Sequence, residues 1–568
     1  MNAAAQIGAT LLLVFIGASV IARPIAALDG DRPSRLKSFE RFVLRLLGTT
    51  PEHEMSFRAY GGAVLALNVV GVVVVYALQR LQHLLPLNPL QLPAVPPGVA
   101  LNTAISFASN TNWQAYGGET TMSLLTQMAA LTTQNFVSAA TGIAVVFALA
   151  RGFTRQRATT IGNFHLDLVR GLVVLVPLSV LFAVALVVDG VPQTLTSTAT
   201  AHLIQGGEQV IALGPVATQV AIKQLGTNGG GFFNANSAHP LENPTPFSNL
   251  LELVALILIP AAMCLVWGRL VKDRAHGRAL LLTMTVLFVP AVIAVVVSEA
   301  DANPVLSALG IDQGAGNLEG KEVRFGTTQS ALWAVTTTAA SNGAVNAMHD
   351  SFMPLSGAVL LILMLLGEVV FGGVGSGLYG LMLFVVVAVF ITGLMVGRTP
   401  ELLGKKIEAT EMKAAAIAIL APSACVLIGL ALSCVVPDGA SSTANPGAHG
   451  FSELLYSFAS TANNNGSAFA GLTVNGAFFA TAHAVCMWIG RFFVIAAVLA
   501  LASSLAKKAS VPVSSATLPT RGPLFVVVVA GTVLLVGALT FVPALALGPV
   551  ADHFELRAAA AANTTVQP

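Results

Sequence analysis

Apolar stretches of about 20 residues recur along the chain, and they limit its fold more than any other feature, because a helix of that length crosses the hydrocarbon core of a bilayer. Of the 568 residues, 55% are hydrophobic and 10% are charged, whereas a soluble domain has about 25% charged residues. The sequence therefore predicts an all-α polytopic membrane protein. The ten expected spans lie near 3–22, 59–84, 127–150, 166–189, 249–270, 279–299, 355–397 (overlong), 414–436, 472–504 (also long) and 523–547.

The first span has the position of a signal peptide, but no basic residue precedes it and no convincing cleavage site follows, so we keep it as a span. Lysines and arginines are distributed unevenly over the segments between spans. Segments 23–58, 151–157, 268–278, 398–413 and 505–522 hold 21 of the 28, and the opposite-side segments hold only Arg80, Lys223, Lys321, Arg324 and Arg557. Cytoplasmic loops carry the excess of Lys and Arg. The first set is therefore predicted to be cytoplasmic and both termini extracytoplasmic.

Four loops on the opposite side each contain a short, half-apolar stretch that ends in a small-polar tetrad. These stretches are ISFASNTNWQAY (105–116), AIKQLGTNGGGFF (221–233), VTTTAASNGAVNA (335–347) and SFASTANNNGSAF (457–469), and their central asparagines are Asn110, Asn228, Asn342 and Asn465. Such a regular period predicts four copies of one unit: span, short re-entrant helix, extended tetrad, span. Irregular backbone persists at membrane depth only where it is buried in protein or lines a cavity. Four tetrads in register therefore favour a shared pore over ordinary surface turns.

The tetrads have the composition of a site for a dehydrated monovalent cation. Glycine tolerates positive φ, which lets successive carbonyls point the same way, and rings of backbone carbonyls can replace the hydration shell of potassium. No tetrad contains a carboxylate, which argues against Ca²⁺ and Mg²⁺. A phosphate-binding loop would need GK[ST] after its glycines, but Phe232 and Phe233 follow here. A net charge of +2 gives no case for a nucleic-acid partner.

Several long motifs resemble those of the KdpA family. They are GTNGGGFFNANSAHPLENPTPFSN (226–249), SNTNWQAYGGE (109–119), SNGAVNAMHDSFMPLSG (341–357), NNNGSAFAGL (463–472) and GRTPELLGKKIEATEMK (397–413). The resemblance covers nearly the whole chain. It implies four fused potassium-channel-like units at 59–157, 158–278, 279–413 and 414–522, with an additional span and loop at 1–58 and an additional span and outer tail at 523–568.

The resemblance also implies a function: potassium-selective binding and translocation in an ATP-driven uptake complex of the bacterial inner membrane. K⁺ would be the transported ion, with no organic cofactor, and the partners would be a P-type ATPase subunit (KdpB), KdpC and the small KdpF. The chain itself contains no DKTGT-type motif and no Walker A, and its longest cytoplasmic segment, 23–58, is too short for an ATPase domain. We therefore expect a non-catalytic subunit. The alternative is a gradient-driven transporter or channel of the Trk/Ktr/HKT type, which the long motif GGGFFNANSAHP (229–240) and the two additional spans disfavour.

The resemblance places the potassium filter at four short runs of residues: Asn110 and Thr111; Thr227, Asn228 and Gly229; Ser341, Asn342 and Gly343; Asn464, Asn465 and Gly466. In this alignment Thr111 stands where the other three loops have glycine. Gln114 and Gly230 are expected to tune affinity, since the Gln114 amide is close enough in sequence to orient filter backbone. A plain polar residue of the outer vestibule is the alternative for Gln114.

The run GEVVFGGVGSGLYG (367–380) interrupts the overlong span. Each glycine costs a helix about 1 kcal/mol relative to alanine, so this helix is predicted to break into a loop beneath the filter. The resemblance implies that the break is a gate or coupling element, with Glu368, Gly372, Gly373 and Gly375 as its candidates. Glu368 is a functional candidate because a carboxyl group in a membrane is costly; a hydrogen-bonded structural carboxyl is the alternative.

Two arginines belong to the same set of gate or coupling candidates. Arg491 either opposes a straight cation exit beneath the filter or snorkels to the cytoplasmic interface. Arg398 begins a cytoplasmic loop and is expected to be an orientation signal or a partner contact.

Overall fold

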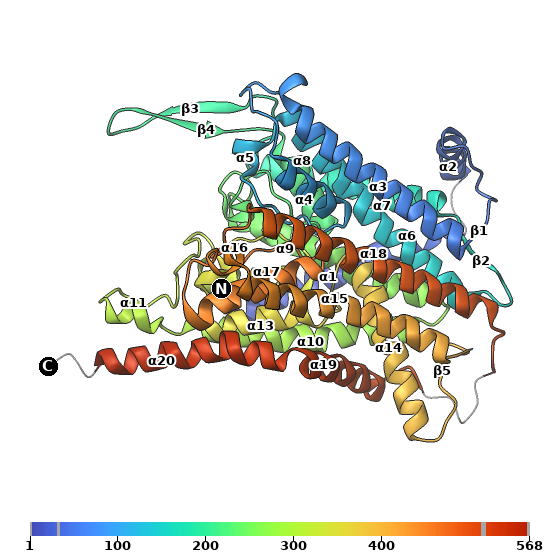
Figure 1. Cartoon of the computed structure of the whole chain (residues 1–568). Helices are drawn as coiled ribbons and strands as arrows, with labels where there is room; N and C mark the ends of the chain where they lie inside the picture. The colour runs from blue at the N-terminus through green and yellow to red at the C-terminus, as the bar shows by residue number, and fades with distance from the viewer. Residues whose placement is uncertain (1–2, 31–33, 513–518, 565–568) are drawn as a thin grey trace.

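The computed structural model describes residues 3–30, 34–512 and 519–564, and ten of its helices are long and apolar enough to cross a membrane (Figure 1). This confirms the all-α polytopic fold and the predicted number of spans. The ten helices are α1 (Ala3–Ala27), α3 (Phe57–Leu81), α6 (Thr133–Thr154), α7 (Phe164–Val188), α9 (Pro246–Leu270), α10 (Arg274–Ala300), α14 (Ser376–Met395), α15 (Ala409–Val435), α18 (Ala477–Lys507) and α19 (Pro523–Leu545).

The predicted overlong span is broken. Its first part is α13 (Pro354–Leu365), residues 366–375 form a loop, and only α14 is long enough to span. The loop contains four residues with left-handed φ, namely Gly367, Glu368, Phe371 and Gly375. The expectation that the glycine-rich run interrupts the helix is therefore confirmed. The span predicted at 472–504 begins later, at Ala477, because residues 463–476 form the fourth tetrad loop and its continuation.

Four short helices precede the four tetrads: α4 (Pro97–Ala108), α8 (Val216–Leu225), α12 (Gly326–Ala339) and α17 (Gly447–Ala462). The longest has 16 residues, which at 1.5 Å per residue reach only about 24 Å. None of the four can cross a bilayer of about 30 Å, as predicted for re-entrant helices.

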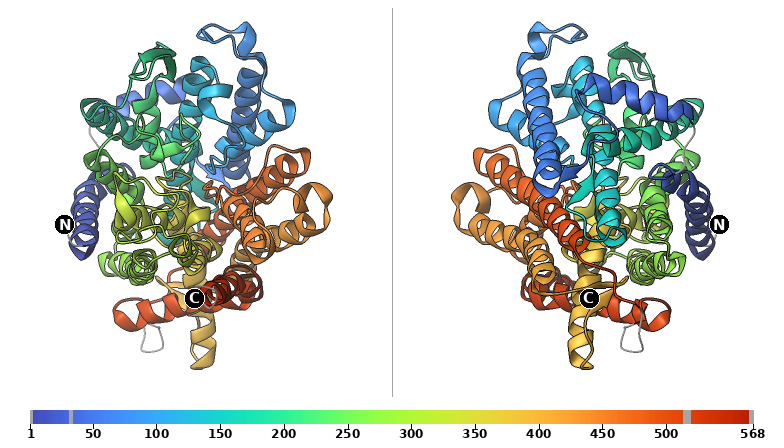
Figure 2. Two further views of the ribbon diagram at one scale, coloured as in Figure 1. Left: turned by 90° about the vertical axis from the view of Figure 1, so that its left-hand side faces the viewer. Right: turned by 90° about the vertical axis from the view of Figure 1, so that its right-hand side faces the viewer.

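Burial divides the ten spans into two classes. In the apolar windows of α6, α9, α14 and α18, 89, 78, 67 and 61% of the residues are buried, against 17 to 33% in the other six. Each inner helix follows a short helix, and each short helix follows one of the peripheral helices α3, α7, α10 and α15. This peripheral–short–inner order occurs four times, with α1 before and α19 after it. Viewed along the spans, the chain colours follow one another around a centre (Figure 2, left).

The remaining elements are short helices, helical turns and strands. They are the helices α2 (Ser34–Leu46), α5 (Gly118–Thr121), α11 (Pro304–Ala308), α16 (Pro437–Ala440) and α20 (Ala551–Thr564), 3₁₀ turns at 82–84, 236–238 and 349–351, π-helical segments at 126–132 before α6 and 546–550 after α19, and the strands β1 (Met55–Ser56), β2 (Thr160–Gly162), β3 (Thr198–His202), β4 (Glu208–Ala212), β5 (Glu401–Leu402) and β6 (Lys405–Lys406). The strands pair antiparallel as β1–β2, β3–β4 and β5–β6; the β3–β4 hairpin pairs Thr198 with Ala212 and His202 with Glu208.

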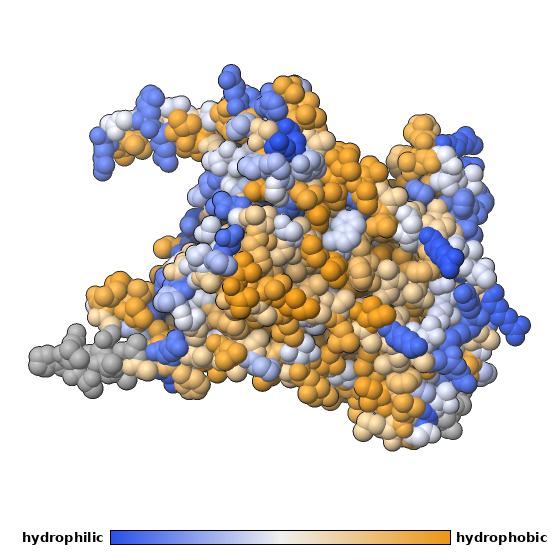
Figure 3. All heavy atoms as spheres, viewed as in Figure 1, coloured by the Kyte–Doolittle hydropathy of each residue, from blue (hydrophilic) through white to orange (hydrophobic). Residues whose placement is uncertain are grey.

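Basic segments meet at one end of the spans. The Lys405 ammonium donates to the carbonyls of Arg155 (2.6 Å) and Lys508 (2.7 Å), and the Lys508 ammonium pairs with Glu411 at 2.7 Å. In Figure 1 this end, with β1, β2 and β5, lies on the right, and the β3–β4 hairpin, α11 and α20 lie on the left. A band of hydrophobic residues separates the two polar ends (Figure 3). This arrangement fits a multi-pass membrane protein.

Candidate ion-binding site

The four tetrads share one backbone conformation. Two residues after each short helix, the chain takes left-handed φ angles of 65° at Asn110, 48° at Thr227, 55° at Ser341 and 62° at Asn464. The N–H of the next residue then donates to a carbonyl five residues earlier, at 2.8 to 3.2 Å, in all four loops. These loops therefore have equivalent positions, which backbone geometry identifies.

This geometry corrects the sequence alignment of the first loop by one residue. Asn110 is equivalent to Thr227, Ser341 and Asn464, and Thr111 is equivalent to the three asparagines. The glycine position of the first loop therefore holds Asn112, not Thr111. Asn112 has a φ of 56°, which asparagine tolerates better than most residues. Asn112 was missed because the loops were aligned by side-chain type; counting from the predicted helix ends would have found it.

Contacts between neighbouring loops close a ring. Asn110 Nδ2 donates to Thr227 O (3.1 Å), joining loops one and two. Gly343 N donates to Asn228 O (3.2 Å), joining loops two and three. The ring is completed by Ser341 Oγ to Asn464 O (2.9 Å) and Asn464 Nδ2 to Thr111 Oγ1 (2.9 Å). The four tetrads, far apart in sequence, thus meet around one axis.

Glycine is required where these loops touch. A Cβ on Gly229 would lie 1.9 Å from Gly343 N, and one on Gly466 would lie 1.8 Å from Thr111 O. The side chains of Asn342 and Asn465 bond to the backbone of short helices: Asn342 Nδ2 donates to Lys223 O (2.9 Å) and Asn465 Nδ2 to Thr337 O (3.0 Å). The asparagines thus brace backbone, which leaves carbonyl and hydroxyl oxygens as the donor set. Among the described residues, the Asn112 and Asn228 side-chain oxygens are also buried without a hydrogen-bond partner.

The ring separates two cavities. The outer one, of about 540 Å³, is lined by Asn112, Gly343 and Gly466 at the ring and by Gln114 beside it. The inner one, of about 80 Å³, is lined at the ring by Ser341 and Asn464. An ion moving between the cavities by the shortest path would pass the tetrads.

Two predicted affinity residues adjoin the second loop. Gln114 Nε2 donates to Gly231 O (2.9 Å), and Gly231 N donates to Gln114 Oε1 (3.0 Å). The Gln114 amide therefore holds the backbone of the second tetrad loop and also lines the outer cavity, and its effect on affinity stays a prediction. A Cβ on Gly230 would lie 2.6 Å from the Phe107 ring.

A buried ion pair is hydrogen-bonded to the second loop. Lys223 and Glu242 are both fully buried and pair with each other. Glu242 Oε1 accepts from Phe233 N (2.9 Å), and the Lys223 carbonyl accepts from Asn228 N (2.8 Å). In the sequence, Lys223 was counted only as a charge of the outer side, and this role was missed. A lone lysine in an apolar short helix, followed by an acid in the same loop, was the available indication.

The broken-helix loop lies directly beneath the ring. Val374 N donates to Thr227 Oγ1 (2.8 Å), and a Cβ on Gly373 would lie 3.3 Å from Ser341 Cβ. On its other side the loop abuts α6, where a Cβ on Gly142 would lie 2.0 Å from Val374 O and one on Gly375 would lie 2.2 Å from Gly142 O. Gly372 is also required, since its Cβ would overlap Glu368 O at 1.6 Å. The predicted position of the loop is confirmed.

Glu368 and Arg491 line the inner cavity. Glu368 is 3% exposed, and among the described residues neither of its carboxylate oxygens has a hydrogen-bond partner. Ser341 and Asn465 are nevertheless polar neighbours of this carboxyl group, so the interpretation as a hydrogen-bonded structural carboxyl stays a prediction. Arg491 is 4% exposed and donates to Ser138 O (3.3 Å), so it does not snorkel to the interface. Arg398 is exposed beyond the end of α14, whose 20 residues separate it from the loop by about 30 Å.

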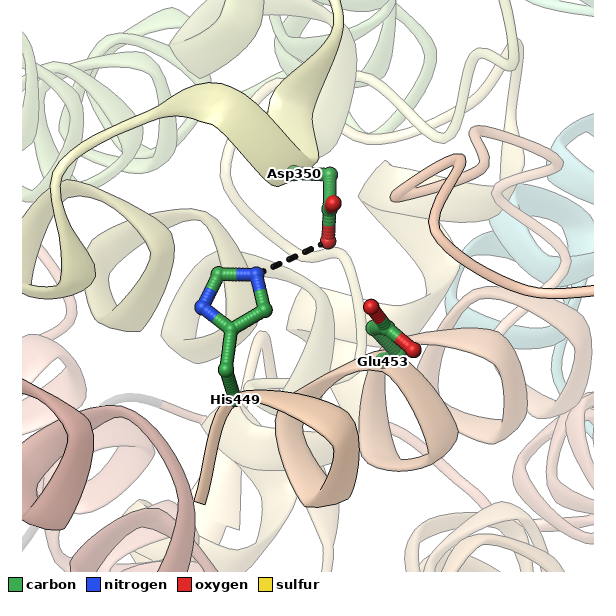
Figure 4. A group of neighbouring side chains, drawn as sticks. All are labelled: Asp350, His449 and Glu453. Atoms are coloured by element: carbon green, nitrogen blue, oxygen red, sulfur yellow. Dashed lines mark hydrogen bonds and ion pairs between the residues drawn. The ribbon is translucent and has the colours of Figure 1, made fainter. Parts of the chain in front are cut away.

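A cluster of charged side chains links three elements on the outer side of the protein. His449 Nε2 contacts Asp350 Oδ1 (3.0 Å), and Glu453 lies beside these two residues (Figure 4). His449 Nδ1 contacts Asp552 Oδ2 (2.8 Å). Burial alone would lower the pKa of His449, but the hydrogen bonds to Asp350 and Asp552 outweigh it and raise the pKa to about 10. Glu453 accepts from Asn445 and from Ala444 N. All three side chains thus have protein partners, and the cluster is an ion-pair clamp.

Comparisons with known proteins give one consistent name. The family model described as "KdpA: Potassium-transporting ATPase A subunit" matches residues 6–554. A protein of Sorangium cellulosum is 59% identical over 569 residues, covering 96% of this chain and 98% of the relative, and one of Laribacter hongkongensis is 56% identical over 561 residues, covering 98% and 99%. A protein of Methylococcus capsulatus is 53% identical over 580 residues, covering 97% and 96%. All three relatives are named potassium-transporting ATPase potassium-binding subunit.

Proposed function

The chain belongs to the KdpA family, the A subunits of potassium-transporting ATPases, and from that premise we propose that it selects potassium ions in the four-loop ring and delivers them to an ATPase partner. The relatives' shared name supports potassium as the bound ion, and it fits a chain that leaves ATP hydrolysis to another subunit. The observation that carries the proposal is the closed ring of tetrads between two cavities.

The potassium ligands would come from the predicted filter residues together with Asn112. These are Asn110, Thr111, Asn112, Thr227, Asn228, Gly229, Ser341, Asn342, Gly343, Asn464, Asn465 and Gly466. Carbonyl and hydroxyl oxygens held by rigid backbone replace a hydration shell without adding charge. The unequal first loop, with Asn112 in place of glycine, breaks fourfold symmetry, and we infer that this asymmetry favours tight binding over fast flow.

The ion would leave the ring sideways. Residues 366–375 cover the inner face of the ring, and the fixed charge of Arg491 opposes a straight cation exit. The inner cavity extends instead between α15 and α19, where Pro422 and Thr540 line it. The buried carboxyl of Glu368 faces this cavity and would stabilise a passing cation. We propose that this is the direction of delivery to a P-type ATPase subunit (KdpB), in a complex that also holds KdpC and KdpF.

The complex would lie in the bacterial inner membrane with the basic segments in the cytoplasm and both termini outside. Arg398, exposed on that cytoplasmic side, is then placed to contact a partner subunit. The fourfold order of peripheral, short and inner helices supports the unit boundaries 59–157, 158–278, 279–413 and 414–522, flanked by 1–58 and 523–568.

The test is potassium-stimulated ATPase activity of the co-purified complex, comparing wild type with Gly229→Asp. A carboxylate in the neutral ring should move half-maximal activation to much higher potassium and leave most of the maximal hydrolysis. Gly206→Asp is the matched control, because Gly206 also has positive φ and its Cβ would meet nothing within 4 Å. Equal potassium dependence of wild type and Gly229→Asp would contradict the proposal.

A further inference from the structure

Helix α2 presents an apolar face away from the rest of the protein. Phe39, Phe42 and Leu46 are 50, 61 and 73% exposed. Residues three and four apart lie on the same face of a helix, so these three side chains form one continuous surface. Such a surface is unfavourable in water, so we expect it to contact an apolar partner.

A basic stripe runs beside the apolar face. Lys37, Arg41 and Arg45 are spaced four residues apart and are exposed, and none of them forms an ion pair among the described residues. The acid of the helix, Glu40, is turned inward: it is 1% exposed and contacts Arg170 Nε at 3.5 Å. The basic stripe therefore keeps its full positive charge.

The position of α2 corresponds to the surface of a membrane. Arg170 is six residues from the start of α7 at Phe164, or about 9 Å along that span, while the headgroup region adds roughly 5–8 Å on each side of the hydrocarbon core. The helix is seen nearly end-on in Figure 1 and side-on in the right view of Figure 2, so its axis runs across the spans. In Figure 3 hydrophobic and hydrophilic residues lie side by side at this place.

We propose that α2 is an interfacial helix that binds anionic phospholipids of the leaflet at the basic end of the protein. Phe39, Phe42 and Leu46 enter the acyl boundary, and Lys37, Arg41 and Arg45 contact the headgroup phosphates. An apolar face combined with a basic polar face has this preference, and juxtamembrane basic clusters are attracted to anionic lipid. The pairing of Glu40 with Arg170 orients the helix so that both faces meet the leaflet.

The test uses the full chain with its four cysteines replaced and a nitroxide label introduced at Phe42→Cys, in vesicles of phosphatidylcholine with or without phosphatidylglycerol. With phosphatidylglycerol, the label should collide with oxygen and be shielded several-fold from a water-soluble nickel chelate. A label at Ile204→Cys, at the fully exposed tip of the β3–β4 hairpin, should collide freely with the chelate. Arg41→Gln with Arg45→Gln should remove the shielding at position 42, whereas the exposed pair Lys272→Gln with Arg274→Gln should not.

Three results would overturn the proposal. The first is equal chelate collisions at positions 42 and 204 in both lipid mixtures. The second is shielding at position 42 that is independent of phosphatidylglycerol and of Arg41 and Arg45, which would leave no role for anionic headgroups. The third is shielding from both reagents only when the other subunits are present, which would assign the face to a protein partner.

Discussion

Gly142→Ala should open a potassium leak through the chain. A Cβ at this position would lie 2.0 Å from Val374 O, whereas carbon and oxygen in close contact are about 3.3 Å apart. The loop at 366–375 must then move by more than 1 Å, and it cannot move toward the ring because Val374 N is bonded to Thr227 Oγ1. Overpacking of this kind costs about 1–3 kcal/mol.

If the loop is the barrier, that cost falls on the closed state, and a cost of about 1–3 kcal/mol raises the open population roughly 5- to 150-fold. The assay is ATP-independent potassium flux into proteoliposomes that contain the purified complex. Gly531→Ala is the matched control, because Gly531 also lies inside a span and its Cβ would meet nothing within 4 Å. A Gly142→Ala complex that keeps its ATPase activity and shows the flux of the control would refute the barrier role of the loop.

Three further predictions concern the surroundings of the ring. Lys223→Met should destabilise the complex by about 3–5 kcal/mol because it leaves Glu242 buried without its partner. The double variant Lys223→Met with Glu242→Leu should regain part of that stability, measured by thermal unfolding. Equal loss of stability in both variants would contradict the pairing. The pKa of His449 is raised from 6.5 to about 10, so its clamp should stabilise the fold fully below pH 6.5 and progressively less as the pH rises to about 10. The Tm difference between wild type and His449→Gln should therefore shrink at alkaline pH. A difference that stays constant with pH would exclude the charged clamp. Gln114→Ala should raise the potassium concentration for half-maximal ATPase activation without lowering the maximum, since it releases Gly231, whereas Tyr116→Phe, which removes only the hydroxyl that Gln114 Nε2 contacts at 3.1 Å, should not.

Much of the fold follows from hydrophobicity alone, because bilayer thickness sets the length of each span. The ten spans and the break before α14 were predictable for this reason, since six glycines in 367–380 are incompatible with a stable helix. Neither α2 nor the β3–β4 hairpin was predicted. Both lie outside the spans, where apolar run length gives no information.

At the site, the tetrads were predictable from their repeat, but their register was not. Asn110 and Asn228 are the same residue type, yet the left-handed φ of Asn110 makes it structurally equivalent to Thr227. The role of Lys223 was hidden because charge counting treats every loop lysine as a surface residue. The position of Arg491 was open because its long span permits either snorkelling or burial, and only packing against Ser138 decides between them.

The most direct measurement of the central hypothesis is the anomalous scattering of thallium, a potassium substitute, in crystals of the complex. We expect density on the axis of the four tetrads, between Gly229, Gly343 and Gly466, and its loss in Gly229→Asp with the fold retained. Thallium bound elsewhere, with none between the tetrads of the wild-type protein, would contradict the assignment of the ring as the potassium filter.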